Sequence, residues 1–547
     1  MKELFRIIDP LFGPNNIYKM PAKKTVSLGP VMIGTVANKN LPWLEVEIIN
    51  ENNCRKNLGA PLDKDGVLSH FDLQSSRRAD YIGISASMTN AVPRAKKIIE
   101  TYRNLPQNLR PKAIIVGGWH AGDSPEEFLE VGADVVLHGE GERSIAELLK
   151  ALSTKESLEN FPGISFIDHG VTKRNAPDFV FLTEEELENL PCPDFGLVRF
   201  AKIELFPLSR TRGCSGKCRF CRVRTNPRSI SPQKLLEQVE TLASQGVHKF
   251  FIIDDRSEED LEGFRQLLKG LIYLQEKKSL YLEFTTQDRL SLAEDLETLA
   301  LMGKAGIEMV AIGFESPIPE ELTAMRKPIN PKKMIKWTKA FKKNGLHVHA
   351  MMIFGYPLST CANPKIVESM KNITVKDRAK AFWSFIQKAK PDSLQVLLYT
   401  PIIGTEDYAF LKREGRLFKN FDLSLYDGMH LVFRPDKGID PEELQEESIR
   451  LMRKFYCFNW LWRFSRISLI LNSLRTAFFW IAMPILWLIN FLLRHFFNHS
   501  LRQASCLAWQ KAKKPFRKAS LSLGGNAIII SWLKSFRKMK IVFPKKP

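Results

Sequence analysis

The sequence predicts an α/β protein in three consecutive parts: a doubly wound, Rossmann-like parallel sheet, a six-unit β/α partial barrel, and an α-helical C-terminal region rich in basic and apolar residues. Short β-forming runs alternate with helical segments between about residues 25 and 155, and the alternation returns between residues 205 and 435. Beyond residue 450, Lys and Arg are interspersed with aromatic and aliphatic side chains. We therefore expect domains at residues 1–155, 205–435 and 436–547, with a hairpin and linker at 156–204.

The first part contains β-forming runs at residues 46–49, 79–85, 113–118 and 133–142, separated by helical segments. This alternation predicts a parallel sheet, whose ligands bind beyond the carboxyl ends of the strands. Glycines at those ends let the backbone approach a flat or phosphate-bearing ligand, although a structural turn is the simpler interpretation of each glycine pair taken alone. The candidate binding residues at these ends are Ser85, Ser87, Thr89, Gly117, Gly118, Trp119, His120, Gly139, Glu140 and Gly141.

The barrel is predicted from six strand-like runs at residues 205–209, 249–253, 281–285, 309–314, 347–354 and 394–399. Active sites of such barrels gather at the carboxyl ends of the strands. The polar residues at these ends are Asp254, Asp255, Gln287, Arg289, Glu315, Ser316 and Tyr356. His347 and His349 alternate on the fifth strand and share one face, where they are expected to line the substrate cavity or simply to pack.

Three cysteines, Cys214, Cys218 and Cys221, lie in the stretch RGCSGKCRFC with a C-x-x-x-C-x-x-C spacing. Three thiolates can hold three irons of a cubane cluster and leave the fourth iron open. Electron-transfer clusters and structural zinc sites usually have four protein ligands, and no fourth cysteine is nearby. The other five cysteines are scattered singly, which favours a reducing cytoplasm over a disulfide framework.

The cysteine spacing, with Gly213 before it and Phe220 within it, resembles the signature of the radical S-adenosylmethionine (radical SAM) superfamily. The resemblance implies a 4Fe-4S cluster on the three cysteines, which are then catalytic, and S-adenosylmethionine on its open iron, with Phe220 near the adenine. It also implies that the barrel-end residues Asp254, Asp255, Gln287, Arg289, Glu315 and Ser316 bind S-adenosylmethionine, with Glu315 of GFES the clearest match.

The first part resembles the cobalamin-binding domain that precedes many radical SAM barrels, through its GGWH and HGEGE stretches. The D-x-H-x-x-G motif of cobalamin mutases is absent, so cobalamin is expected to bind with no protein imidazole on cobalt. The alternative is a domain that has kept the fold and lost the cofactor.

The resemblance implies reductive cleavage of S-adenosylmethionine to a 5′-deoxyadenosyl radical and, with cobalamin, modification of an unactivated carbon. Methyl transfer is the leading expectation, and cobalamin-assisted cyclisation or rearrangement is the alternative. A different class is a membrane-docked cobalamin or redox sensor without turnover. A flavodoxin- or ferredoxin-like electron donor is implied, whereas no RNA-reading module supports nucleic acid as a partner.

The formal net charge of +20 is concentrated in the C-terminal region. Residues 451–547 contain 18 Lys and Arg and no Asp or Glu, which leaves 62 basic and 60 acidic residues elsewhere. Basic residues among aromatic ones favour an anionic membrane surface. Ala477–Leu493 is a 17-residue uncharged stretch interrupted by Pro484, at the lower limit for a membrane span. We expect a cytoplasmic enzyme, peripheral to or anchored at the membrane, with a hydrophobic substrate.

Overall fold

The computed structural model describes residues 2–327, 329–418 and 421–456. These residues form two compact units. The first contains the described residues up to Lys234 together with Thr400–Arg434, and the second contains Leu235–Tyr399 and the described residues from Pro435 to Tyr456. The domain boundaries expected at residues 155, 204 and 435 stay predictions.

An eight-stranded sheet forms the centre of the first unit, in the order β7-β6-β5-β4-β3-β1-β2-β8. Its strands are β1 (Glu3–Asp9), β2 (Leu44–Asn50), β3 (Tyr81–Ser85), β4 (Ala113–Gly117), β5 (Val135–Leu137), β6 (Ile164–Asp168), β7 (Val171–Arg174) and β8 (Val198–Arg199). Strands β1 to β5 and β8 pair in parallel, and the hairpin β6–β7 is added antiparallel to β5. This order confirms the predicted parallel sheet.

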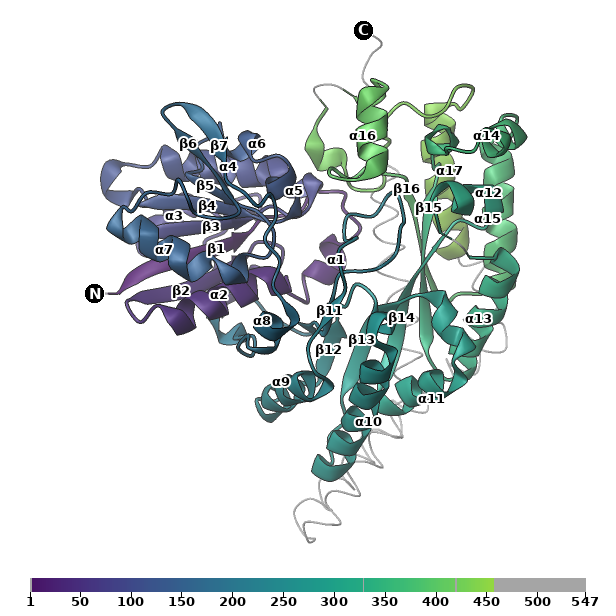
Figure 1. Ribbon diagram of the computed structural model, residues 1–547, viewed down its shortest axis with the longest axis horizontal. Coiled ribbons are helices and arrows are strands. Elements are labelled where there is room, and N and C mark those ends of the chain that lie inside the picture. Colours follow the sequence, from purple (N-terminus) through teal and green to yellow (C-terminus); the bar gives the residue numbers. More distant parts are fainter. Residues whose placement is uncertain (1, 328, 419–420, 457–547) are drawn as a thin grey trace. The chain divides into compact units, whose positions relative to one another are not determined.

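Helices cover both faces of this sheet, as a doubly wound fold requires (Figure 1). Helix α2 (Leu28–Asn40) lies on one face, where Gly34 approaches Val46 and Ile48, and it contacts α7 (Ile145–Thr154). Helix α4 (Val92–Arg103) lies on the other face and packs its buried apolar side chains into a core that includes Ile82, Ile114 and Val136 of the sheet. Shorter helices are α1 (Lys19–Ala22), α3 (His70–Ser76), α5 (Trp119–Asp123), α6 (Glu126–Leu129) and α8 (Glu184–Glu188).

The remaining elements of the first unit lead into the cysteine-bearing loop, close it or pair with its side chains. Strand β9 (Phe206–Leu208) leads to a two-stranded antiparallel pair, β10 (Thr211–Arg212) and β11 (Arg228–Ser229), which closes the cysteine-bearing loop. Helix α16 (Glu406–Arg413) belongs to the same unit and is capped by Thr405, whose hydroxyl accepts from the backbone N–H of Tyr408.

The second unit has a parallel sheet with β12 to β16 in sequential order. These strands are β12 (Lys249–Ile252), β13 (Glu283–Asp288), β14 (Ile307–Glu315), β15 (His347–Phe354) and β16 (Ser393–Leu398). The helices are α9 (Pro232–Ser244), which begins in the first unit, and α10 (Leu261–Lys278), α11 (Leu296–Ala305), α12 (Pro319–Ala324), α13 (Pro331–Lys343), α14 (Pro364–Met370), α15 (Val375–Ala389) and α17 (Pro441–Tyr456).

Helices α10, α11, α13, α15 and α17 contact one another in succession along the sheet (Figure 1). With β9, six strands alternate with helices along the chain, which confirms the predicted partial barrel. Helix α17 is the described beginning of the predicted C-terminal region, whereas Ala477–Leu493 lies outside the described residues. In the described part of the chain, no helix combines the length and apolar character needed to span a bilayer.

Candidate functional site

The three cysteines lie on a loop, residues 213–227, whose two ends are joined by the β10–β11 pair. The backbone N–H of Cys214 donates to Thr225 O at 3.1 Å, so the loop is also fastened just inside its ends. Gly213 has a φ of 87°, and a Cβ there would lie 2.6 Å from the carbonyl oxygen of Asn226. Glycine is therefore needed where the two arms of the loop meet.

The donor set of this loop fits an iron-sulfur cluster. None of the three cysteines forms a disulfide, and the backbone nitrogen of Gly216 donates to Cys214 Sγ at 3.4 Å, a contact that stabilises a ligating thiolate. No three Cys, His, Asp or Glu side chains of the described residues are grouped as ligands of one metal ion. A cubane does not need such a group, because each thiolate binds a different iron. Cys214, Cys218 and Cys221 would hold the cluster and leave one iron for S-adenosylmethionine.

Arginines of the cysteine loop pair with the acidic first turn of α16. Arg219 donates to Asp407 at 2.8 Å, and the Asp407 side chain is completely buried. Arg224 donates to Glu406 at 2.7 Å and to the carbonyl oxygen of Cys221 at 3.2 Å. These bonds fix the backbone on both sides of Phe220 and Cys221.

The residues predicted to bind cobalamin lie at the carboxyl ends of β3, β4 and β5. Ser85 pairs in register with Gly117, which pairs in turn with Leu137 on β5. His120 is buried, with its Nδ1 3.0 Å from Thr89 Oγ1 and its Nε2 3.5 Å from Glu127. One nitrogen of the imidazole thus has a hydrogen-bond partner within the protein, and the role of His120 at the cobalamin site stays a prediction.

Two of the glycines in these motifs have structural reasons of their own. Gly118 has a φ of 112°, and a Cβ there would lie 2.5 Å from Ser87 Oγ. Gly139 has a φ of 88°, and its Cβ would lie 2.1 Å from the carbonyl oxygen of Val180. The N–H of Glu140 donates to that same oxygen at 2.8 Å. The glycines thus bring two backbone segments together at the edge where a flat ligand would lie.

Carboxylates of these motifs pair with arginines that flank the cysteines. Glu140 pairs with Arg212 and Arg228, and Glu142 pairs with Arg212. Burial alone would raise the pKa of Glu140, but bonds from Arg228, Arg212 and the N–H of Leu182 outweigh it and hold that pKa below its usual range. We did not predict these arginines, although their positions on both sides of the cysteine motif were visible in the sequence.

In the second unit, Glu315 ends β14 with a φ of 58°, an uncommon conformation for a residue other than glycine. Its Oε1 accepts from Lys327 Nζ at 2.5 Å. Gly313 leaves the space for this carboxylate, because a Cβ there would lie 2.3 Å from Glu315 Oε1. Ser316 donates to Glu321, which also pairs with Arg378 at 3.1 Å. Buried polar contacts thus hold the GFES stretch in place. One of the contacting residues, Lys327, was not predicted from the sequence.

The polar residues after β12 and β13 differ in exposure. Asp254 is completely buried and Asp255 is exposed. Gln287 and Arg289 are half-buried, whereas Asp288 between them is buried on the opposite face of the strand. Burial raises the pKa of Asp288 well above its usual range, and the nearby charges of Glu258 and Asp254 raise it further. We did not predict Asp288, because its position in the alternation assigns it to the core.

His347 and His349 lie at the beginning of β15, and both rings reach Ser393 Oγ. Burial lowers the pKa of His349 to about 4, so this ring is neutral at pH 7. Tyr356 follows β15 and packs edge-on against Tyr399, with ring centres 4.9 Å apart. The cavity-lining role of these three residues stays a prediction.

In the comparison with known proteins, two family models match two separate parts of the chain. The Radical SAM superfamily profile matches residues 208–360, and the B12 binding domain profile matches residues 56–149. An uncharacterized methyltransferase of Pyrococcus horikoshii is 26% identical over 338 residues, covering 60% of this chain and 68% of that protein. A hopanoid C-3 methylase of Methylococcus capsulatus is 24% identical over 407 residues, covering 71% and 72%.

Solved structures share the fold. The radical S-adenosylmethionine methyltransferase TsrM of Kitasatospora setae, with cobalamin and a 4Fe-4S cluster bound, has a TM-score of 0.60 at 16% identity, over 83% of this chain and 88% of that one. The cobalamin-dependent S-adenosylmethionine radical enzyme OxsB, with aqua-cobalamin bound, has a TM-score of 0.60 at 15% identity, over 98% and 80%.

A three-cysteine loop, a partial barrel and a B12-binding domain define a cobalamin-dependent radical SAM enzyme. The chain therefore contains a Radical SAM domain and a B12-binding domain, and the relatives that it resembles include proteins named methyltransferases. Its cofactors are a 4Fe-4S cluster, S-adenosylmethionine and cobalamin.

Proposed function

We propose that the enzyme transfers a methyl group to an unactivated carbon of a hydrophobic, lipid-like substrate. The observation that carries this proposal is the similarity to the hopanoid C-3 methylase, which extends over 71% of this chain. A hopanoid C-2 methylase of Rhodopseudomonas palustris is 24% identical over 262 residues, covering 46% of this chain and 47% of that protein. Both relatives are named for methylation of a lipid skeleton.

The chain's own residues bind and orient the reactants in this proposal. When bound, the cofactors supply reductive cleavage of S-adenosylmethionine and a transferable methyl group. Cys214, Cys218 and Cys221 hold the cluster, and Phe220 packs near the nucleoside. Glu315 and the other barrel-end residues bind S-adenosylmethionine, and the glycine-bearing edge of β3, β4 and β5 takes cobalamin.

Product analysis under anaerobic conditions tests the proposal. The full chain is reconstituted with iron and sulfide and given cobalamin, S-adenosylmethionine, a reductant and a hopanoid. Hydrogen abstraction releases 5′-deoxyadenosine and methyl donation releases S-adenosylhomocysteine, so both products and a methylated lipid are expected. All three should disappear when Cys214, Cys218 and Cys221 are changed to Ala. Both by-products with no methylated hopanoid would reject this lipid as substrate.

The same assay separates the alternatives. Deoxyadenosine without S-adenosylhomocysteine would favour cyclisation or rearrangement, the kind of reaction named for a relative of Cereibacter sphaeroides, an anaerobic magnesium-protoporphyrin IX monomethyl ester cyclase that is 22% identical over 400 residues. A reduced cluster with neither product would favour a sensor. A flavodoxin- or ferredoxin-like donor should replace the chemical reductant if the enzyme turns over.

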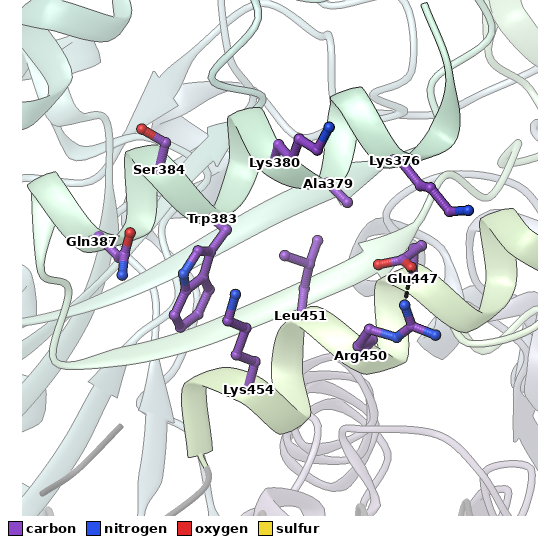
Figure 2. A pocket seen from close by; sticks show the side chains of 10 residues that line it. All are labelled: Lys376, Ala379, Lys380, Trp383, Ser384, Gln387, Glu447, Arg450, Leu451 and Lys454. Atoms are coloured by element: carbon purple, nitrogen blue, oxygen red, sulfur yellow. Dashed lines mark hydrogen bonds and ion pairs between the residues drawn. The ribbon is translucent and has the colours of Figure 1, made fainter. Parts of the chain in front are cut away.

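The proposal includes docking of the second unit on an anionic membrane. A groove of about 340 Å³ lies between α15 and α17 (Figure 2). Trp383 and Leu451 give it an apolar lining, and four cations and one carboxylate surround it: Lys376, Lys380, Arg450, Lys454 and Glu447. The Nζ of Lys454 lies 4.2 Å from the centre of the Trp383 ring. Lys376 and Lys380 also pair with Glu443 and Asp377, each at 3.6 Å, and Arg450 pairs with Glu447, so the cations outnumber the carboxylates by four to three. This small excess matches the phosphate of an anionic lipid, and Trp and Leu match the apolar region below it.

The position of the groove in the chain supports the same partner. Helix α17 ends at Tyr456, where the segment rich in basic and apolar residues begins. That segment contains no Asp or Glu up to the end of the chain, so its charge has the same sign as the cations of the groove. A common anionic partner, the lipid surface, would therefore engage both.

A further inference from the structure

The cysteine loop is closed by a pair of strands that is weak by itself. Strands β10 and β11 pair only Thr211 with Ser229 and Arg212 with Arg228. So short a pair is marginally stable in water, and like charges directly opposite each other destabilise an antiparallel pair. The loop that would carry the cluster therefore depends on another group to compensate its two opposed guanidinium groups.

Glu140 is that group. Its Oε2 lies 2.7 Å from Arg228 Nη1, and its Oε1 lies 3.2 Å from Arg228 Nη2 and 3.3 Å from Arg212 Nη1. The carboxylate thus contacts both arginines. Glu142 completes the balance, because its Oε1 lies 2.9 Å from Arg212 Nη2. The side chains of Glu140 and Glu142 are 14% and 6% exposed, so water screens these pairs only weakly.

A second contact holds the loop immediately after its last cysteine. Arg222 donates to the two carboxylate oxygens of Asp123 at 2.8 and 2.9 Å, in the two-bond geometry that fixes both side chains. Its guanidinium lies 4.6 Å from the centre of the Trp119 ring and 4.9 Å from that of Phe179. Gly404 leaves room for the pair, since a Cβ there would lie 2.3 Å from Asp123 Oδ2.

Both carboxylates come from the segments that we expect to bind cobalamin. Glu140 stands between Gly139 and Gly141, and Asp123 is at the end of α5, which begins at Trp119. We propose that Glu140 and Asp123 are positioning residues that hold the cysteine loop ready for its cluster and thereby couple cluster assembly to cobalamin binding. Ordering of either segment orders the other through the same ion pairs. By linkage, each cofactor then raises the affinity for the other by the same factor.

Cobalamin affinity measured with and without the cluster tests the coupling. The full chain is titrated with hydroxocobalamin, followed by its absorbance, before and after anaerobic cluster assembly. We expect the cluster to tighten cobalamin binding roughly 5- to 150-fold, the usual range for coupled sites. In Glu140→Gln, which keeps the shape and removes the charge, this ratio should fall towards one and bound iron per chain should decrease. Asp123→Asn should have the same effect.

A matched control separates this effect from a general loss of stability. Asp134→Asn removes a carboxylate that pairs with Arg103 in the same unit, away from the cysteine loop. It should keep both the iron content and the affinity ratio of the wild type. Neither readout requires a substrate, so they remain informative if the lipid proposal fails. Wild-type iron content and an unchanged affinity ratio in Glu140→Gln and Asp123→Asn would overturn the inference.

A double variant keeps the test decisive if Glu140→Gln folds poorly. Changing Glu140 and Arg228 together to Gln leaves Arg212 paired with Glu142, so charge balance at the strand pair returns. Iron content in the double variant should recover towards the wild-type value. No recovery would mean that Glu140 acts through something other than these charges, and the inference would be rejected.

Discussion

The carboxylate of Glu315 lies 2.5 Å from the ammonium group of Lys327, and each of these side chains is only 10% exposed. Lys327 follows α12, while Glu315 ends β14 in a left-handed conformation. A buried ion pair contributes little net stability compared with apolar residues, but a single charge left behind is costly. The pair therefore fixes the backbone of the GFES stretch, where Glu315 is expected to contact S-adenosylmethionine.

Removing one partner should reveal this cost. Lys327→Met should lower the free energy of unfolding by about 3–5 kcal/mol, because the Glu315 carboxylate remains buried without its cation. Lys333→Met is the control: Lys333 pairs with Glu294 at 3.2 Å, but both side chains are about 60% exposed, and an exposed pair contributes about 0–1 kcal/mol. Denaturant unfolding of the two variants measures the difference. Equal effects would show that Glu315 finds solvent or another partner.

Asp9 should make stability depend on pH. It ends β1, and burial, reinforced by the charge of Glu51, raises its pKa from 3.8 to about 6 despite a hydrogen bond from Ser27. Because the folded-state pKa is the higher one, the stabilising contribution is complete below about pH 4 and is lost as pH rises through 6. Two pKa units correspond to about 3 kcal/mol.

The variant Asp9→Asn isolates that contribution, since Asn resembles the protonated acid and still accepts from Ser27. The free energy of unfolding of the variant, minus that of the wild type, should increase by about 3 kcal/mol between pH 4 and pH 7. Denaturant titrations across this range give the difference directly. A difference that stays constant with pH would show that the pKa of Asp9 is the same in the folded and the unfolded protein.

The strand that contains Asp9 shows where sequence interpretation reached its limit. Its residues gave no strand prediction, because Arg6 and Asp9 interrupt the apolar run, yet β1 lies inside the sheet between β2 and β3. Arg6 is completely buried there because Glu47 and Gln74 accept from it, each at 2.6 Å. Local pattern predicted β2 to β5 of the parallel core. Local pattern could not predict β1, because the residues that accept hydrogen bonds from the buried Arg6, Glu47 and Gln74, are distant in sequence.

The same limit applies to the site. The cysteine spacing and the barrel-end positions were visible along the chain, because each depends on a few consecutive residues. The partners of these residues were not visible, because Glu140 meets Arg228 across 88 positions and Asp123 meets Arg222 across 99. Long-range ion pairs leave no periodic signal in one sequence. These ion pairs became visible only in the folded structure.

Substitution of Gly139 tests whether this glycine of the HGEGE stretch is needed for the fold itself, independently of cobalamin. Gly139→Ala places a Cβ 2.1 Å from the Val180 carbonyl oxygen, whereas Gly170 has a similar φ, 80°, and nothing within 4 Å of its Cβ. Gly170→Ala should cost only the conformational term of about 1–2 kcal/mol. Gly139→Ala should cost a further 1–3 kcal/mol or so through the clash, in the absence of cobalamin. Equal losses in thermal unfolding would mean that the Val180 segment moves away freely.

The basic groove between α15 and α17 predicts binding to anionic vesicles. The variant Lys376→Gln/Lys380→Gln removes two exposed cations on the α15 side, and Lys336→Gln/Lys339→Gln removes two exposed cations on α13. We expect the full chain to sediment with phosphatidylglycerol vesicles and not with phosphatidylcholine vesicles. Each cation near an anionic surface contributes about 1 kcal/mol, so loss of the groove pair should weaken binding several-fold or more at low salt.

Two further variants show whether the groove, the net charge or the C-terminal segment causes vesicle binding. The α13 variant should bind like the wild type, because a docked groove leaves those cations away from the lipid. A chain ending at Tyr456 should keep a weaker, groove-dependent association, since it loses the 91 remaining residues but retains α17. Equal weakening by both pairs would indicate attraction by net charge alone. Unchanged binding by the groove variant would assign membrane attachment to the C-terminal segment and remove the groove from the proposal.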